Sequence, residues 1–121
     1  MRSALRFIVG LGLLLTPTRA SAQDKYFDSK GVQIRYVDQG SGEAVVLVHG
    51  YTNTIERAWV DTGVISNLAK DHRVIALDLR GHGKSGKPRD PNAYGQEMAQ
   101  DIVRLLEHLR LPRAHIVGYS L

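Results

Sequence analysis

The sequence contains no cysteine among its 121 residues. No disulfide can tie the fold together and no lipid can be attached through an amino-terminal cysteine, so core packing has to hold the structure. A chain of this length forms one domain at most. No internal repeat or low-complexity segment is present either, which excludes a repeat architecture.

Acidic residues are missing from the first 22 positions, which hold Arg2, Arg6 and Arg19. The formal net charge of the whole chain is +4, and without these three arginines 13 bases stand against 12 acids. The basic character therefore belongs largely to this leader. It gives poor support for a nucleic-acid partner, and we expect none.

The sequence also lacks an apolar run long enough to span a membrane. The apolar stretch near its start, residues 7–15, has only nine residues. At about 1.5 Å per residue it reaches less than half of the roughly 30 Å bilayer core, so we expect no stable membrane span. The basic start, this apolar stretch and Ala20-Ser21-Ala22 form the three parts of a secretory signal peptide. The sequence predicts a signal peptide over residues 1–22, cleavage after Ala22 and a mature domain over residues 23–121.

We therefore expect a secreted or periplasmic protein, and export without disulfides suits a bacterial periplasm or medium. An uncleaved anchor and a misassigned start codon are the alternatives.

Two apolar patterns predict strands. Val32, Ile34 and Tyr36 alternate with polar or mixed residues, which is typical of a half-buried strand, and residues 26–28 pair with it in a hairpin. Residues 44–49 and 73–78 instead carry continuous apolar runs rich in β-branched residues. Such runs are typical of strands covered on both faces in a parallel sheet.

Two helices are expected between the later strands. Asp61 is placed to cap the first, Trp59 seals its entrance, and its buried face holds Val64, Ile65, Leu68 and Ala69. The second lies near residues 96–110, where apolar residues recur at helical spacing, and Pro112 stops it. A last strand leads to Gly118. The order hairpin, then strand–helix–strand–helix–strand predicts an α/β domain with parallel strands.

Polar motifs follow three of the predicted strands. They are His49-Gly50-Tyr51, the stretch from Asp78 to Ser85 (D-L-R-G-H-G-K-S), and Gly118-Tyr119-Ser120-Leu121. The carboxyl ends of parallel strands share one edge of the sheet, where such folds place their ligands.

In order and spacing, these three motifs resemble the α/β-hydrolases of the esterase, C–C hydrolase and haloperoxidase-like group. The resemblance covers residues 26–121. It implies the N-terminal half of an α/β-hydrolase sheet, incomplete at the C-terminus and ending at the nucleophile elbow G-x-S-x-G. It also implies a small-molecule substrate with an ester or related carbonyl bond.

Within this resemblance Ser120 is the nucleophile, and the backbone N–H groups of Tyr51 and Leu121 form the oxyanion hole. The side chain of Tyr51 either lines the acyl or alcohol pocket or is an exposed loop aromatic. Thr52 stands where relatives often have proline, which puts the path of this loop in question. A serine nucleophile argues against haloalkane dehalogenases and epoxide hydrolases, which attack with a carboxylate.

The resemblance implies site-shaping roles for a further set of residues. Asp78, Arg80 and His82 are expected to form one hydrogen-bonded corner at the floor of the site, while the basic run that starts at Arg80 is interpreted as a solvated loop. The full set is His49, Gly50, Asp78, Arg80, Gly81, His82, Gly118 and Tyr119.

Two nucleotide-binding interpretations of the same loop fail. Gly81, Gly83 and Gly86 fit a dinucleotide fingerprint, but Pro88 and Pro91 forbid the helix that it must open. A phosphate loop would need glycine in place of Asp78. We therefore predict no cofactor and no metal.

No histidine of the chain is an evident partner for Ser120. His115 precedes it by five residues, or about 16 Å along a strand, and the resemblance implies that His49 and His82 are structural. In that family the triad acid and histidine follow the serine, so we expect this chain alone to be inactive. The rival hypothesis is a non-catalytic exported module that binds a ligand or partner.

Overall fold

The computed structural model describes residues 22–120. The predicted signal peptide, up to Ser21, and the predicted oxyanion donor Leu121 lie outside the described residues. No helix of the described chain is long and apolar enough to cross a membrane.

The described chain opens with an antiparallel hairpin of β1 (Lys25–Ser29) and β2 (Val32–Gln39), as the alternating pattern predicts. Lys30 and Gly31 form its turn, with φ of 51° and 84°. Two positive φ values are typical of the type I′ turn, whose twist suits a tight hairpin.

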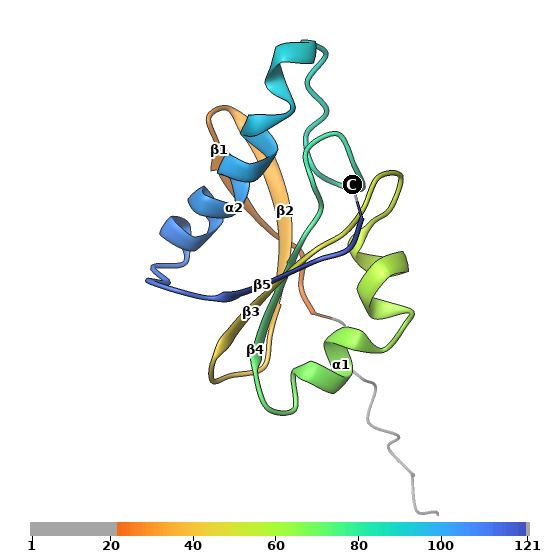
Figure 1. Cartoon of the computed structure of the whole chain (residues 1–121), viewed down its shortest axis with the longest axis vertical. Helices are drawn as coiled ribbons and strands as arrows, with labels where there is room; N and C mark the ends of the chain where they lie inside the picture. The colour runs from red at the N-terminus through yellow and green to blue at the C-terminus, as the bar shows by residue number, and fades with distance from the viewer. Residues whose placement is uncertain (1–21, 121) are drawn as a thin grey trace, which may run out of the picture.

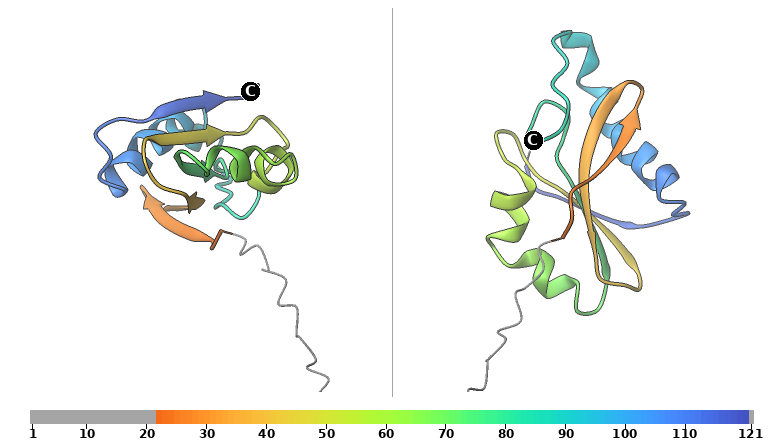
Figure 2. Two further views of the ribbon diagram at one scale, coloured as in Figure 1. Left: turned by 90° about the horizontal axis from the view of Figure 1, so that it is seen from below. Right: turned by 180° about the vertical axis from the view of Figure 1, so that it is seen from behind.

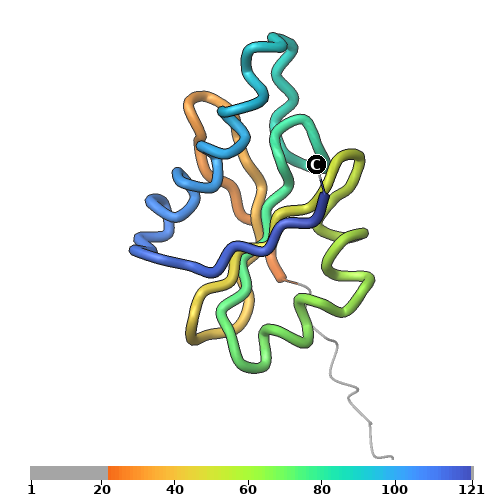
Figure 3. Tube along the Cα trace, viewed as in Figure 1, coloured from red at the N-terminus to blue at the C-terminus, as the bar shows by residue number. Residues whose placement is uncertain are grey.

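Three further strands continue the sheet: β3 (Ala44–Val48), β4 (Arg73–Leu77) and β5 (His115–Gly118). The strand order is β1-β2-β4-β3-β5. β3 pairs in parallel with both β4 and β5, and β2 pairs antiparallel with β4. β5 therefore lies beside β3 at the edge of the sheet, and in Figure 3 its blue trace passes in front of the other strands. The α/β fold with parallel strands is confirmed.

Helical segments cover the two faces of the sheet (Figure 2). The helix α2 (Gln96–His108) packs on one face, over a core around Ile34, Val46 and Ile75. The other face is covered by a single π-helical turn, η1 (Glu56–Val60), and by α1 (Val64–Leu68), over a core around Leu47 and Val74. A short 3-10 turn, η2 (Pro91–Ala93), precedes α2.

The predicted capping of the first helix by Asp61 is wrong. Asp61 follows η1, and its backbone N–H donates to the carbonyl of Glu56 at 2.9 Å. α1 starts later, after Gly63, whose φ of 77° reverses the chain, and it has no side-chain cap. The reason is the π-helical turn, which delays the helix start and places Trp59 in the core beneath it.

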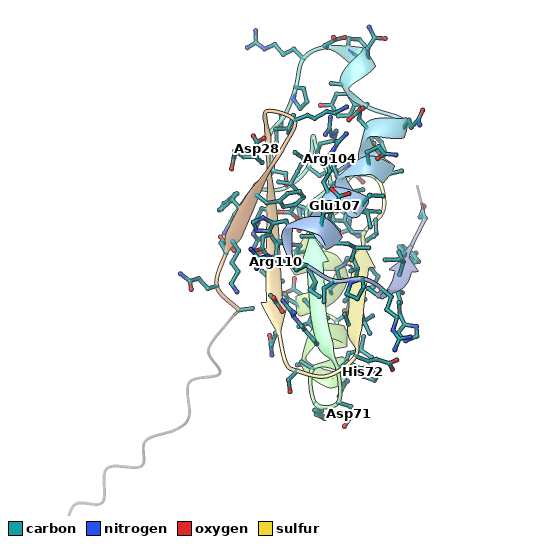
Figure 4. All side chains as sticks on the ribbon, turned by 90° about the vertical axis from the view of Figure 1, so that its left-hand side faces the viewer. Asp28, Asp71, His72, Arg104, Glu107 and Arg110 are labelled. Carbon is teal, nitrogen blue, oxygen red and sulfur yellow. The ribbon has the colours of Figure 1, made fainter. Side chains whose placement is uncertain are left out.

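The end of α2 also differs from the prediction, because the helix stops at His108, before Pro112 is reached. Arg110 takes a φ of 53°, and the N–H of Leu111 donates to the carbonyl of Leu106 at 2.9 Å. This is a Schellman closure with arginine in the place usually taken by glycine. Figure 4 labels Arg110 at this end of the helix.

The edge strand β5 is poorly covered within the described chain. Ile116 is 49% exposed and Val117 44%, although neighbouring β3 is buried. Successive residues of a strand point to opposite faces of the sheet. Because Ile116 and Val117 are both exposed, an apolar surface is open on each face of β5.

We predict that the 121-residue chain binds the dye 1-anilinonaphthalene-8-sulfonate, because β5 offers this apolar surface. The double variant Ile116→Thr/Val117→Thr should bind clearly less dye. Val103→Thr, at an apolar position of α2 that is 46% exposed, is the matched control and should leave the fluorescence unchanged. Equal fluorescence from all three chains would show that β5 is not the exposed apolar surface.

Candidate functional site

The loops that follow β3, β4 and β5 meet at one edge of the sheet, and Figure 1 shows the carboxyl end of the chain beside the other two loops. Gly50 lies where the loop after β3 contacts the loop after β5. A Cβ at this position would lie 2.7 Å from the carbonyl oxygen of Tyr119 and 3.1 Å from the Cβ of Ser120. Only glycine allows this approach, so the first and third sequence motifs touch each other.

Ser120 occupies a sharp turn after β5. The N–H of Tyr119 still donates to the carbonyl of Val48 at 3.1 Å, continuing the parallel pairing. Ser120 then takes a φ of 57°, a left-handed conformation that a serine adopts at an energetic cost and that is concentrated at functional sites. Its Oγ lies 3.6 Å from where a Cβ on Gly50 would stand. The hydroxyl therefore lies against the loop that carries Tyr51.

His49 is completely buried and engaged at both ring nitrogens. Its Nε2 accepts a hydrogen bond from the N–H of Leu79 at 3.1 Å, so the proton sits on Nδ1, which donates to the carbonyl of Gly50 at 2.8 Å. Burial lowers the pKa of His49 and keeps it neutral. This side chain ties the loop after β3 to the end of β4 and has no nitrogen left for proton transfer.

Asp78 is a fully buried carboxylate that joins three segments. Its Oδ1 accepts the N–H of Ile55 at 2.9 Å, and its Oδ2 accepts the N–H of Lys84 at 3.0 Å and the Nη1 of Arg35 at 3.0 Å. A Cβ at Gly83 would overlap this carboxylate, which explains the glycine there. Both loops that approach Ser120 are thus fastened to Asp78.

Sequence reasoning missed Arg35, whose side chain is only 4% exposed. It contacts three carboxylates, from Asp24, Glu56 and Asp78. Burial alone would lower its pKa, but hydrogen bonds to Glu56, Asp78 and Asp24 outweigh burial and raise the pKa above its ordinary value. In return, the hydrogen bond from Arg35 lowers the pKa of Glu56.

A second buried ion pair overturns the interpretation of Arg80 as solvated. Arg80 is 2% exposed, and its Nε and Nη2 bind both oxygens of Asp101 at 2.7 and 2.6 Å. Asp101 lies on α2 and was not predicted, although it shares the helical face of the apolar residues Met98 and Leu105.

The predicted single corner of Asp78, Arg80 and His82 is therefore two separate networks. The side chain of Asp78 binds Arg35, whereas that of Arg80 binds Asp101. His82 joins the second network, because its Nδ1 donates to the carbonyl of Arg80 at 3.1 Å.

A hollow of about 550 Å³ opens beside these loops. Tyr51 lines it and is 75% exposed. A Cβ at Gly81 would lie 2.8 Å from the ring of Tyr94, so glycine lets this ring close one wall. The lining residues are Tyr51, Thr52, Gly81, His82, Tyr94 and Met98.

Other features of the described chain lie away from this edge. A smaller hollow of about 350 Å³ is formed by residues 42–44 and 111–115, at the amino ends of β3 and β5. Over residues 22–120, no three histidine, aspartate or glutamate side chains are grouped so that they could hold a metal ion.

Comparison with known proteins identifies the fold. A family model described as alpha/beta hydrolase fold matches residues 43–121. The chain belongs to the α/β-hydrolase fold family. The match includes all three loops of the site.

Individual relatives cover most of this chain but little of their own length. The dihydrolipoyllysine-residue acetyltransferase component of the acetoin cleaving system of Cupriavidus necator is 33% identical over 84% of this chain and 26% of that protein. Esterase YbfF of Escherichia coli is 35% identical over 69% of this chain and 31% of the esterase.

Among solved structures, an epoxide hydrolase from Vigna radiata, VrEH1, superposes with a TM-score of 0.73. It is 21% identical and the match covers 82% of this chain and 32% of the plant protein, which shows the shared fold alone. The chain thus spans about a quarter to a third of the length of these relatives.

We predict that Arg35→Gln lowers the free energy of unfolding by about 3–5 kcal/mol, because it leaves the buried Asp78 charge without its partner. The matched control is Arg73→Gln. Arg73 also makes two hydrogen bonds to one carboxylate, that of Asp38, but its side chain is 30% exposed. Water can therefore partly solvate Asp38 in the control variant, and the loss of stability should be clearly smaller. Urea unfolding of the protein expressed from its full reading frame measures both. Equal losses would mean that the buried pair has no special role.

Proposed function

We propose that this chain carries the nucleophile and part of the oxyanion hole of an exported serine hydrolase that acts on ester or related carbonyl bonds. The observation that carries this proposal is the placement of Ser120. It sits in a left-handed turn at the carboxyl end of β5 and lies against Gly50. An exposed serine in such a turn, beside a glycine-containing loop, fits the nucleophile elbow of this family.

The proposed chemistry is acyl transfer. The Ser120 Oγ attacks the carbonyl carbon while a base takes its proton, and the negative charge moves to the carbonyl oxygen. The backbone N–H of Tyr51, next to the contact between Gly50 and Ser120, stabilises this oxyanion together with the N–H of Leu121. The base then returns its proton to the departing alcohol, and water releases the acid from the acyl-enzyme in a second cycle. No cofactor takes part.

The histidines of the described chain do not suit the role of the base. His49 has both nitrogens occupied. His72 lies at the amino end of β4, at the far end of the sheet (Figure 4). His108 stacks on Phe27 of the hairpin at 5.5 Å.

The two remaining histidines fail for different reasons. His115 pairs in register with Val45 at the start of β3 and β5, away from Ser120. His82 is oriented by a neutral backbone carbonyl, whereas a triad histidine is stabilised by a carboxylate when it takes up the proton. We infer that the triad histidine and acid come from outside residues 22–120.

A serine nucleophile separates this proposal from the activity named for the plant relative. Epoxide hydrolases resemble this chain but attack with a carboxylate, whereas a hydroxyl suits acyl transfer. The esterase relative supports the same choice. Export, cleavage after Ala22 and a secreted or periplasmic location remain part of the proposal and rest on the three-part leader alone.

We predict that Ser120→Ala lowers hydrolysis of 4-nitrophenyl acetate by roughly 10⁴- to 10⁶-fold, because the acyl-enzyme can no longer form. The protein is expressed from the longest reading frame that contains these 121 residues. Ser41→Ala, at an exposed position in the loop between β2 and β3, is the control and should keep full activity. A fluorophosphonate probe should label Ser120 in both the parent and the control.

Hydrolysis that survives in Ser120→Ala would defeat the proposed mechanism. A protein that is folded, inactive and unlabelled would support the rival hypothesis of a non-catalytic binding module. The 121-residue chain by itself should show no triad-level turnover.

A further inference from the structure

Three of the six residues that line the hollow beside the Ser120 loop carry rings, namely Tyr51, His82 and Tyr94. The ring of Tyr51 stands edge-on to that of His82, with centroids 5.8 Å apart and planes at 79°, and His82 stands at 62° to His49 at 5.3 Å. Tyr94 forms another wall and is held by a hydrogen bond from its hydroxyl to the carbonyl of Pro88 at 2.8 Å. A volume of about 550 Å³ falls in the range of roughly 300–1,000 Å³ typical of small-molecule sites.

The Nε2 of His82, one of the residues that line the hollow, has no hydrogen-bond partner within residues 22–120. The Nδ1 of His82 donates to the carbonyl of Arg80, and the neutral tautomer that fits this bond has its lone pair on Nε2. No other described residue hydrogen-bonds this Nε2. The ring is also held in place, because Arg80 itself is fixed by its two hydrogen bonds to Asp101. His82 therefore contributes a fixed ring with an unused acceptor nitrogen to the lining of the hollow, beside Tyr51, Tyr94 and Met98.

The hollow lies next to the proposed reaction centre. Tyr51 lines it and directly follows Gly50, which is in contact with Ser120. A carbonyl group held at Ser120 would leave the rest of an ester free to extend past Tyr51 into the hollow.

We propose that this hollow binds a hydroxyl-bearing aromatic ring and that the Nε2 of His82 accepts the hydrogen bond of the ring hydroxyl. The favoured substrates are esters that carry a phenolic ring. The rings of Tyr51 and Tyr94 pack against it in edge-to-face or offset geometry, and the thioether of Met98 adds a favourable contact with aromatic groups. This inference names the substrate class of the proposed hydrolase and rests on that function.

The test measures binding in the Ser120→Ala protein, expressed from its full reading frame, so that no ligand is hydrolysed. The probes are 4-hydroxybenzamide, 4-methoxybenzamide and cyclohexanecarboxamide, and calorimetry gives each Kd. We expect the hydroxyl probe to bind about tenfold more tightly than the methoxy probe, which cannot donate to Nε2. The saturated ring should bind most weakly.

Variants assign this preference to particular side chains. His82→Phe keeps a ring but removes the acceptor, and it should abolish the preference for the hydroxyl probe; His82→Gln, which offers an amide oxygen, should restore part of it. Tyr51→Ala should weaken both aromatic probes. Tyr26→Ala is the matched control, because Tyr26 is also an exposed tyrosine but lies on β1, and it should change nothing.

Equal affinities for the hydroxyl and methoxy probes would overturn the proposal, and so would a preference that persists in His82→Phe. Loss of ester hydrolysis in His82→Phe to the level of Ser120→Ala would also overturn it, since His82 would then be the general base. The binding comparison does not depend on catalysis. A failure of Ser120 as the nucleophile can therefore be told apart from a failure of the hollow to select phenolic rings.

Discussion

The buried carboxylate of Asp78 is the group on which the geometry of the site depends. It accepts hydrogen bonds from the backbone of the loop after β3, through Ile55, and from the loop after β4, through Lys84. Arg35, from β2, supplies the opposing charge. Ser120 lies against the first of these loops. Asp78 therefore positions the loop that Ser120 contacts, although Asp78 and Ser120 are not hydrogen-bonded to each other.

A buried ion pair is weak support for stability but strongly restricts geometry, because every oxygen and every N–H must find a partner. Here the restriction extends to distant parts of the chain. Arg35 also binds Asp24 and Glu56, so the start of the described chain and the π-helical turn join the same network. The pair of Arg80 and Asp101 does the same for α2 and the loop that carries His82. The loops of the site are thus held in place by two buried ion pairs, Arg35 with Asp78 and Arg80 with Asp101.

The strands and the edge where their loops meet could be predicted from the sequence, because apolar periodicity and strand direction are local properties. The partners of Arg35 and Arg80 could not, since the residues they bind lie far away along the chain and burial of a charge leaves no periodic signal. Asp61 had the right residue type for a cap, but the π-helical turn moved the helix start to Gly63. Arg110 ended α2 in a conformation that favours glycine, so Pro112 was a plausible but mistaken stop.

Native-state hydrogen exchange of the Ile55 and Lys84 amides tests most directly whether Asp78 anchors both loops. Lys84 lies in a turn and Ile55 is the N-cap residue of η1, where amides normally exchange fast unless a further hydrogen bond protects them. Our account predicts that both exchange as slowly as the amides of β4 and that Asp78→Ala speeds up both together. Fast exchange at either position in the unsubstituted protein, or protection that survives in Asp78→Ala, would contradict it.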